Sequence, residues 1–205
     1  MPVDHDRNVL FIHIPKTGGT SILTSLGLWQ SQRSANLRTL FGDFGCVDLQ
    51  HLTLSQAEQY LTPTEFAQYY KFAFVRNPWD RAVSAALWQT KFPEEGIRDL
   101  RDYIDWSERV NRIGARRASD AHALPQSAFV TTRNGSVGVD HIGRFEDFAR
   151  DLQRILGRFL TLSHPLPHKL RHEGRRHYRE YFGGDLQRRA AALYAEDAAR
   201  FGYAF

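Results

Sequence analysis

The feature that most constrains the fold is a pair of short apolar segments, each followed at once by the start of a helix. Residues 8–14 run into PKTGGTS at 15–21, and KFAFVR at 71–76 runs into NPWD at 77–80. In the second pair, asparagine is a good cap, proline fits the first helical position and aspartate suits the first turn. Strands that alternate with helices in this way predict a parallel sheet covered by helices on both faces.

The rest of the chain continues this alternation. Capping-box patterns at 55–58 and 62–65 predict two short helices that run toward residues 61 and 69. The polar stretch 111–139 predicts a loop or lid. The other expected elements are strands at 47–52 and 140–145 and helices at 20–28, 77–89, 97–110, 148–160 and 184–202.

We therefore expect an α/β fold, with three layers (α/β/α) around a central parallel sheet and a nucleotide-binding core like that of P-loop proteins. No internal repeat and no linker rich in Pro, Gly or Ser divides the chain. Residues 1–205 are thus expected to form a single domain. Within it, about 90–139 is a candidate lid or acceptor-binding segment.

Composition indicates the class of partner and the cellular compartment rather than the reaction. A formal net charge of +4 suits anionic partners such as nucleotides, nucleic acids or sulfated sugars. Cys46 is the only cysteine, which excludes an internal disulfide and favours a reducing compartment. No apolar run approaches the roughly 18 residues of a membrane span, and the N-terminus lacks the pattern of a secretory signal. These observations predict a cytoplasmic protein with no membrane span.

The loop at 15–21 has the chemistry of a phosphate site. A strand that turns through glycines into a helix directs several main-chain N–H groups at one point. Lys16 adds a positive charge, and Thr17, Thr20 and Ser21 add hydroxyl groups. A phosphate or phosphosulfate group would be held well there. The alternative is a glycine-rich turn with an exposed lysine.

The loop differs from that of the P-loop NTPases, G-x-x-x-x-G-K-[ST], because its lysine precedes the glycines. The strand at 71–76 also ends in Arg76 rather than in an acid that could hold magnesium. Arg76 precedes a capped helix, and Ser84 lies on one face of that helix, so the two are candidates for a second anionic group. For Asp80 and Arg81 the sequence favours an ordinary role in capping and solvating the helix.

PKTGGTS and FVRNPWDRAVSA resemble the two signature motifs of the sulfotransferases that use 3′-phosphoadenosine 5′-phosphosulfate (PAPS). The wording is similar to the branch that holds heparan sulfate 2-O-sulfotransferase and the HNK-1-type carbohydrate sulfotransferases. The resemblance continues in VDHIGRFEDFARDL at 139–152, in HYREYF at 177–182 and in LYAEDAARFGYAF at 193–205.

The resemblance implies a role for each matching residue. Arg76 and Ser84 would hold the 3′-phosphate. Arg175 or Arg176 would add a phosphate contact, although RHEGRRHY departs from the wording of the late family segment. The 5′-phosphosulfate would be held by Lys16, Thr17, Gly18, Gly19, Thr20 and Ser21.

The implied reaction is an in-line displacement, in which negative charge grows on the leaving phosphate oxygen and Lys16 stabilises it. The acceptor hydroxyl needs a general base. The resemblance favours His51, in QHLTL, for that role, and a surface or capping histidine is the alternative. His13, Asp48 and Glu94 are rival bases. The histidines and the cysteine show no metal-ligand spacing, so we expect no metal.

The predicted function is therefore transfer of a sulfuryl group from PAPS to a hydroxyl of a carbohydrate or other small alcohol, with no nucleic-acid partner. Three alternatives stay open: a P-loop-type kinase, a basic nucleic-acid-binding module and a catalytically inactive binder of the nucleotide. Acceptor contacts are expected in the segment 90–132. The candidates are Trp88, Trp106, Arg112, Arg116, Arg117 and Gln126, unless these are ordinary core and surface residues.

Overall fold

The computed structural model describes residues 2–28, 43–44, 47–92, 96–160 and 175–205. Its main sheet has four strands in the order β1-β2-β5-β6. β2, β5 and β6 are parallel, and the edge strand β1 is antiparallel to β2. The strands are β1 (Val3–Asp4), β2 (Val9–Ile12), β5 (Tyr70–Val75) and β6 (His141–Arg144).

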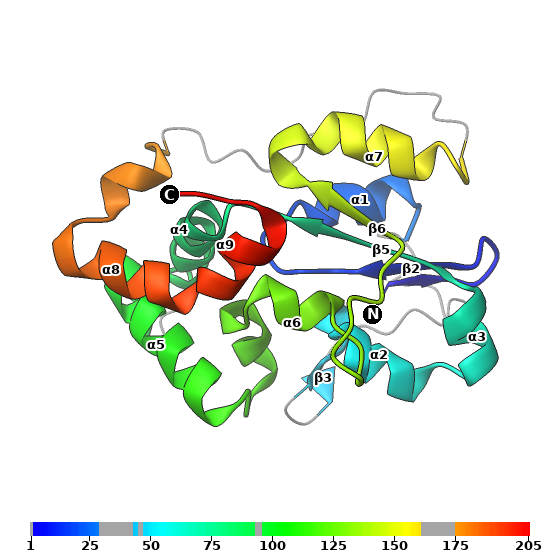
Figure 1. The fold of residues 1–205 in the computed structure, drawn as a ribbon, viewed down its shortest axis with the longest axis horizontal. Coiled ribbons are helices and arrows are strands. Elements are labelled where there is room, and N and C mark those ends of the chain that lie inside the picture. Colours follow the sequence, from blue (N-terminus) through cyan, green and yellow to red (C-terminus); the bar gives the residue numbers. More distant parts are fainter. Residues whose placement is uncertain (1, 29–42, 45–46, 93–95, 161–174) are drawn as a thin grey trace.

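Helices cover both faces of this sheet, as an α/β fold requires (Figure 1). On one face, α1 (Gly19–Ser25) and α7 (Phe148–Leu156) pack against phenylalanines of β2 and β5. On the other face, α2 (Leu54–Tyr60) and α6 (Gln126–Val130) pack against the alternate strand residues. The side-chain period of two along each strand thus separates two apolar clusters. The prediction of an α/β fold with a mostly parallel sheet is confirmed.

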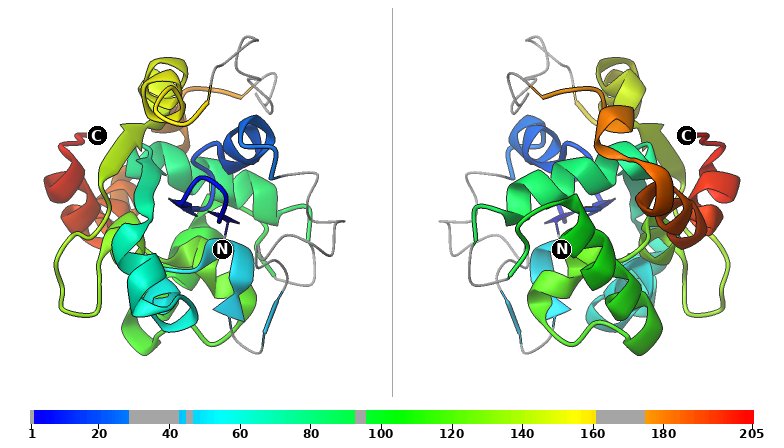
Figure 2. Two further views of the ribbon diagram at one scale, coloured as in Figure 1. Left: turned by 90° about the vertical axis from the view of Figure 1, so that its right-hand side faces the viewer. Right: turned by 90° about the vertical axis from the view of Figure 1, so that its left-hand side faces the viewer.

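A third apolar cluster lies beyond the carboxyl ends of the parallel strands. It is formed by helices that include α4 (Pro78–Gln89), α5 (Leu100–Ile113), α8 (Gly184–Leu193) and α9 (Ala195–Phe201). Figures 1 and 2 show these helices grouped at one end of the sheet. Ligands of parallel α/β sheets bind outside the carboxyl ends of the strands, so this end is where a site is expected.

The remaining elements are short. α3 (Pro63–Gln68) precedes β5, and a separate hairpin pairs β3 (Asp43–Phe44) with β4 (Val47–Asp48). In the part of the chain that the structure describes, 3₁₀ segments lie at Leu49–His51, Ala118–Ala123, Phe145–Asp147 and Tyr178–Tyr181. None of the described helices is long and apolar enough to span a bilayer.

Several predicted boundaries are wrong for identifiable reasons. The first capping box is formed by Thr53 with Gln56, two residues earlier than predicted, whereas the box of Thr62 with Glu65 is confirmed. The strand expected at 47–52 ends after two residues and continues as a 3₁₀ segment. The helix expected at 184–202 is divided into α8 and α9 at Tyr194.

The segment 111–139, predicted as a loop, contains the helix α6, which no capping pattern in the local sequence indicates. α6 has no side-chain cap of its own before it. Instead, the buried carboxylate of Asp197 accepts hydrogen bonds from the main-chain N–H groups of Gln126 and Ser127, both at 2.8 Å. A helix cap supplied from some 70 residues further along the chain leaves no pattern in the segment itself. Phe129 and Val130 of α6 are fully buried against the sheet.

Candidate functional site

The loop after β2 is shaped to receive an anion. Lys16 and Gly18 both adopt left-handed backbone conformations, with φ of +70° and +90°. Thr17 is buried, and its hydroxyl donates a hydrogen bond to the carbonyl of Ile14 at 2.8 Å, so it braces the loop from within. Among the described residues, the main-chain N–H groups of residues 16–20 have no acceptor. Successive N–H groups in such a turn form a concave anion site.

Gly19 is required by the ring of His13, which lies directly against it. A Cβ atom at Gly19 would stand 1.7 Å from Nε2 of His13. That ring is buried, stacks on Phe11 with centroids 5.2 Å apart and accepts a hydrogen bond from Gln50 on its Nδ1. The ring therefore has little freedom to move away, and the second glycine of the loop is sterically necessary.

We expect Gly19→Ala to destabilise the fold by about 1–3 kcal/mol, because the new methyl group overpacks a buried contact. Urea unfolding measures the change. In a His13→Ala background, Gly19→Ala should lower the free energy of unfolding less than it does in the wild type, because the ring that the new methyl group meets is gone. Without that clash, alanine is the better helix residue. An equal cost in both backgrounds would show that the His13 ring is not the cause.

Lys16 is a partly buried cation beside other cations. Its ammonium lies 4.4 Å from the centre of the Trp88 ring, on α4. Burial, and after it the positive charges of Arg76, Lys91 and Arg175, lower the pKa of Lys16 to about 8. Among the described residues no carboxylate pairs with Lys16. A bound anion would therefore relieve an unfavourable charge arrangement.

Arg76, at the end of β5, touches the same loop. Its Nη1 donates to the carbonyl of Lys16 at 3.1 Å, and its guanidinium stacks 4.2 Å from the centre of the Phe145 ring. The side-chain amide of Gln126 bonds both the N–H and the carbonyl of Arg76, at 2.9 and 2.8 Å. The two anion-binding candidates that the sequence indicated separately are thus adjacent.

Asp80 joins Arg76 to the late segment of the chain. Its carboxylate accepts from Nε of Arg76 at 2.6 Å and from Nη2 of Arg175. Nη2 of Arg175 also donates to the carbonyl of Asp80 at 3.0 Å. The interpretation that Asp80 only caps and solvates α4 is therefore wrong, because Asp80 links Arg76, four residues before it, to Arg175, 95 residues after it.

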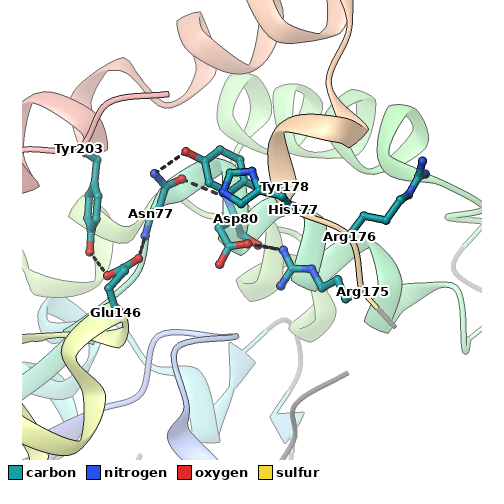
Figure 3. A pocket seen from close by; sticks show the side chains of 8 residues that line it. All are labelled: Asn77, Asp80, Glu146, Arg175, Arg176, His177, Tyr178 and Tyr203. Carbon is teal, nitrogen blue, oxygen red and sulfur yellow. Dashed lines mark hydrogen bonds and ion pairs between the residues drawn. The ribbon is translucent and has the colours of Figure 1, made fainter. Parts of the chain in front are cut away.

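A pocket of about 590 Å³ opens beside this group (Figure 3). Glu146 forms one wall, accepting from the N–H of Asn77 at 2.6 Å and from the hydroxyl of Tyr203 at 2.8 Å. Arg175 points to Asp80, whereas Arg176 points away from it and lies over the ring of Tyr181. The pocket is lined by Asn77, Asp80, Glu146, Arg175, Arg176, His177, Tyr178 and Tyr203.

Arg81 is the second correction to the sequence interpretation. It is only 1% exposed, so it is not a solvated helix residue. Its Nε donates to the carbonyl of Pro15 at 3.1 Å, and its Nη2 donates to the carbonyls of Leu124 at 2.9 Å and His122 at 3.4 Å. Arg81 thus ties the phosphate-type loop to the segment before α6. Ser84, also buried, lies one helical turn after Asp80.

His51 lies against the loop rather than on the surface. It is 7% exposed, its ring centre is 4.3 Å from that of His13, and its Nδ1 is 2.7 Å from the His13 carbonyl. A carbonyl only accepts, so Nδ1 of His51 carries the proton and Nε2 holds the lone pair of the neutral ring. That is the tautomer a general base needs, fixed by a second group.

Of the other candidate bases, His13 is the one whose side chain the structure describes. His13 is engaged by Gln50 and Gly19, and burial, followed by the charges of nearby groups, lowers its pKa well below the usual value. Nothing is described for the side chain of Asp48. Glu94, Cys46 and the histidines at 164, 168 and 172 lie outside the described residues. Among the residues that are described, no group of three His, Cys, Asp or Glu side chains could hold a metal ion.

Two acceptor-contact candidates prove to be core residues. Gln126 is 0% exposed and bonds the main chain of Arg76. Trp106 is buried, and its Nε1 donates to Asp120 at 2.9 Å. Arg112 and Arg116 are exposed, and Trp88 lies beside Lys16. The positioning roles of Gln126 and Arg81 escaped sequence reasoning, because their partners are main-chain groups of distant segments.

Comparison with known proteins assigns a single relationship. A family model described as "Sulfotransferase family" matches residues 1–204. No curated protein and no solved structure matches the chain. The match covers the loop after β2, the start of α4 and the late segment that carries Arg175.

Proposed function

Because the chain belongs to the sulfotransferase family, we propose that it moves a sulfuryl group from PAPS to a hydroxyl of a carbohydrate or other small alcohol. The family relationship supports sulfuryl transfer in general. The donor is our inference from the site, and the acceptor class is our inference from the resemblance of the two signature motifs. The observation that carries it is the loop at 16–20, which includes the cation Lys16 and is contacted by the guanidinium of Arg76. Its main-chain N–H groups have no acceptor among the described residues.

PAPS has two anionic ends, and the described residues offer two cationic regions. The loop with Lys16 suits the 5′-phosphosulfate, through the residues 16–21. Arg76, Arg175 and Ser84 suit the 3′-phosphate, and Nε of Arg175 is buried with no hydrogen-bond partner among the described residues. The pocket beside them, with the rings of Tyr178 and His177, has room for the nucleoside. The contacts of Arg175 with Asp80 support Arg175 over Arg176 as the late phosphate contact.

In this reaction the acceptor oxygen forms a bond to sulfur while the bond from sulfur to the 5′-phosphate oxygen breaks. The electron pair of the broken bond stays on the phosphate oxygen, where the Lys16 ammonium stabilises the charge. Nε2 of His51 receives the acceptor proton. The main-chain N–H groups of the loop hold the phosphate and bear no proton-transfer role.

The proposal predicts that 3′-phosphoadenosine 5′-phosphate (PAP), the product nucleotide, raises the melting temperature without magnesium. At 100 times its dissociation constant the gain is about 2.7 kcal/mol of stability. The stabilisation should decline as pH rises above about 8, because the pKa of Lys16 is about 8 and the free enzyme then loses the cation. Thermal shift at several pH values measures both effects.

ATP with magnesium is the control for the kinase alternative. A kinase would be stabilised more by ATP with magnesium than by PAP alone. If PAP produces no shift at any pH from 6 to 8, the assignment of PAPS as donor is wrong. Single-stranded oligonucleotides provide the corresponding control for a nucleic-acid-binding module.

A further inference from the structure

His122 stands beside the candidate base although it lies 71 residues further along the chain than His51. The two rings meet edge to face, with centroids 5.1 Å apart. The Arg81 guanidinium donates both to the carbonyl of His122 and to the carbonyl of Pro15, the residue before Lys16. The ring of His122 therefore contacts the candidate base, and its main chain shares the donor Arg81 with the residue before Lys16.

The main chain of His122 is held in a fixed place. Its carbonyl accepts from the hydroxyl of Tyr103 at 2.8 Å as well as from Arg81. Both donors are buried, and they come from different helices, α5 and α4. Such anchoring gives the side chain the precise position that a catalytic group needs.

The ring of His122 has one nitrogen that the fold leaves without a partner. Nδ1 is buried and makes no hydrogen bond with the described residues, whereas Nε2 is not one of the buried side-chain atoms that lack a partner there. An N–H group buried without an acceptor is costly. The proton of the neutral ring is therefore on Nε2, which makes His122 a donor where His51 is an acceptor.

Burial, and after it the charges of His51, Lys16 and Arg81, lower the pKa of His122 well below its usual value. The ring is thus neutral at physiological pH and does not compete with His51 for the acceptor proton. A neutral donor beside a cation and a base is suited to an oxygen that carries partial negative charge.

Resting on the proposed function, we propose that His122 is a catalytic residue whose Nε2–H donates a hydrogen bond to a sulfuryl oxygen during transfer. The sulfuryl group in flight has Lys16 at the leaving-oxygen end and His51 at the attacking-oxygen end. A ring that touches His51, and whose main chain is tied through Arg81 to the loop of Lys16, is placed to reach the equatorial oxygens of that group. His122 transfers no proton in this step, and the bonds made and broken are those given above.

Two variants separate the hydrogen bond from the packing of the ring. His122→Phe keeps a ring against His51 and removes the donor, whereas the amide of His122→Gln places an N–H near the position of Nε2. We expect His122→Phe to lower the rate of sulfuryl transfer about 10²-fold, the effect of removing one preorganised donor. His122→Gln should recover at least a tenth of the wild-type rate.

The measurement uses PAPS labelled in the sulfuryl group, with release of sulfate to water and transfer to a panel of alcohols followed in parallel. Because water replaces the acceptor in the first assay, both rates should fall together in His122→Phe. PAP lacks the sulfuryl group, so its thermal shift should be the same in the variant and the wild type.

Loss of transfer to alcohols with undiminished release to water would place His122 on the acceptor and overturn the proposal. So would a His122→Gln protein as inactive as His122→Phe, since an N–H group near the position of Nε2 would then not be what the reaction needs. A His122→Phe protein as active as the wild type would also overturn the proposal, since the ring would then serve only as packing. If wild-type protein is not stabilised by PAP and transfers no label, the proposed function itself fails, and this inference fails with it.

Discussion

Replacing Lys16 with methionine is expected to lower the turnover of sulfuryl transfer by about 10²–10³-fold, the range for removing one preorganised electrostatic contact at a developing negative charge. Methionine keeps a long side chain that can still rest on Trp88, so the loop should fold. The effect is large because the Lys16 ammonium is partly desolvated and because Arg76 holds the main-chain carbonyl of Lys16 in place. Charges in such surroundings are screened less than charges in water.

Lys91→Met provides the matched control, since the Lys91 ammonium also lies over Trp88, at 5.4 Å, but outside the loop. Its turnover should change less than threefold. Single-turnover kinetics with labelled PAPS separate the chemical step from binding. Turnover of Lys16→Met within tenfold of the wild type would remove Lys16 from the chemical step even if the family assignment stands.

Much of the site was predictable because it depends on local sequence. The loop after β2 and the start of α4 each combine a strand end, special backbone residues and a charged side chain within about ten positions. Asn77 caps α4 through the N–H groups of Trp79 and Asp80, as its position before Pro78 predicts. Patterns of this kind can be recognised from sequence, because the residues that form the loop or the cap lie within the same short segment.

The rest of the site was not predictable because it depends on contacts between distant segments. Arg81 looks like a solvated helix residue until three main-chain carbonyls are found around its guanidinium. Gln126 holds both polar main-chain groups of Arg76, and Asp197 in turn caps the helix that carries Gln126. No periodicity marks such residues, since the partner in each case is a backbone group.

These contacts have a common consequence. Arg81, Gln126 and Asp197 form no part of the proposed reaction, yet they set the positions of Pro15, Arg76 and α6. Burying an arginine has a desolvation cost, and the hydrogen bonds of Arg81 to three carbonyls offset that cost only when all three carbonyls are in place. The loop, α4 and the segment before α6 are therefore expected to order together, so that the cations of the site are preorganised before a ligand arrives.

Replacing His51 with asparagine is expected to lower turnover by about 10²–10⁴-fold, the usual contribution of a general base. The asparagine amide can still donate to the carbonyl of His13, as Nδ1 does now at 2.7 Å, so the fold around the loop should persist. PAP should therefore shift the melting temperature of His51→Asn as it shifts that of the wild type. This separation of binding from turnover distinguishes a base from a residue that only supports the loop.

His5→Asn is the control, because among the described residues His5 contacts Tyr69 and Glu65 and no residue of the loop. This variant should leave turnover within twofold. His51→Ala adds a second readout, since imidazole supplied in solution should restore part of the lost rate if a base is what is missing. A structural histidine would show no such rescue, and the pH profile would keep its shape. If His51→Asn transfers at the wild-type rate, the base is another group.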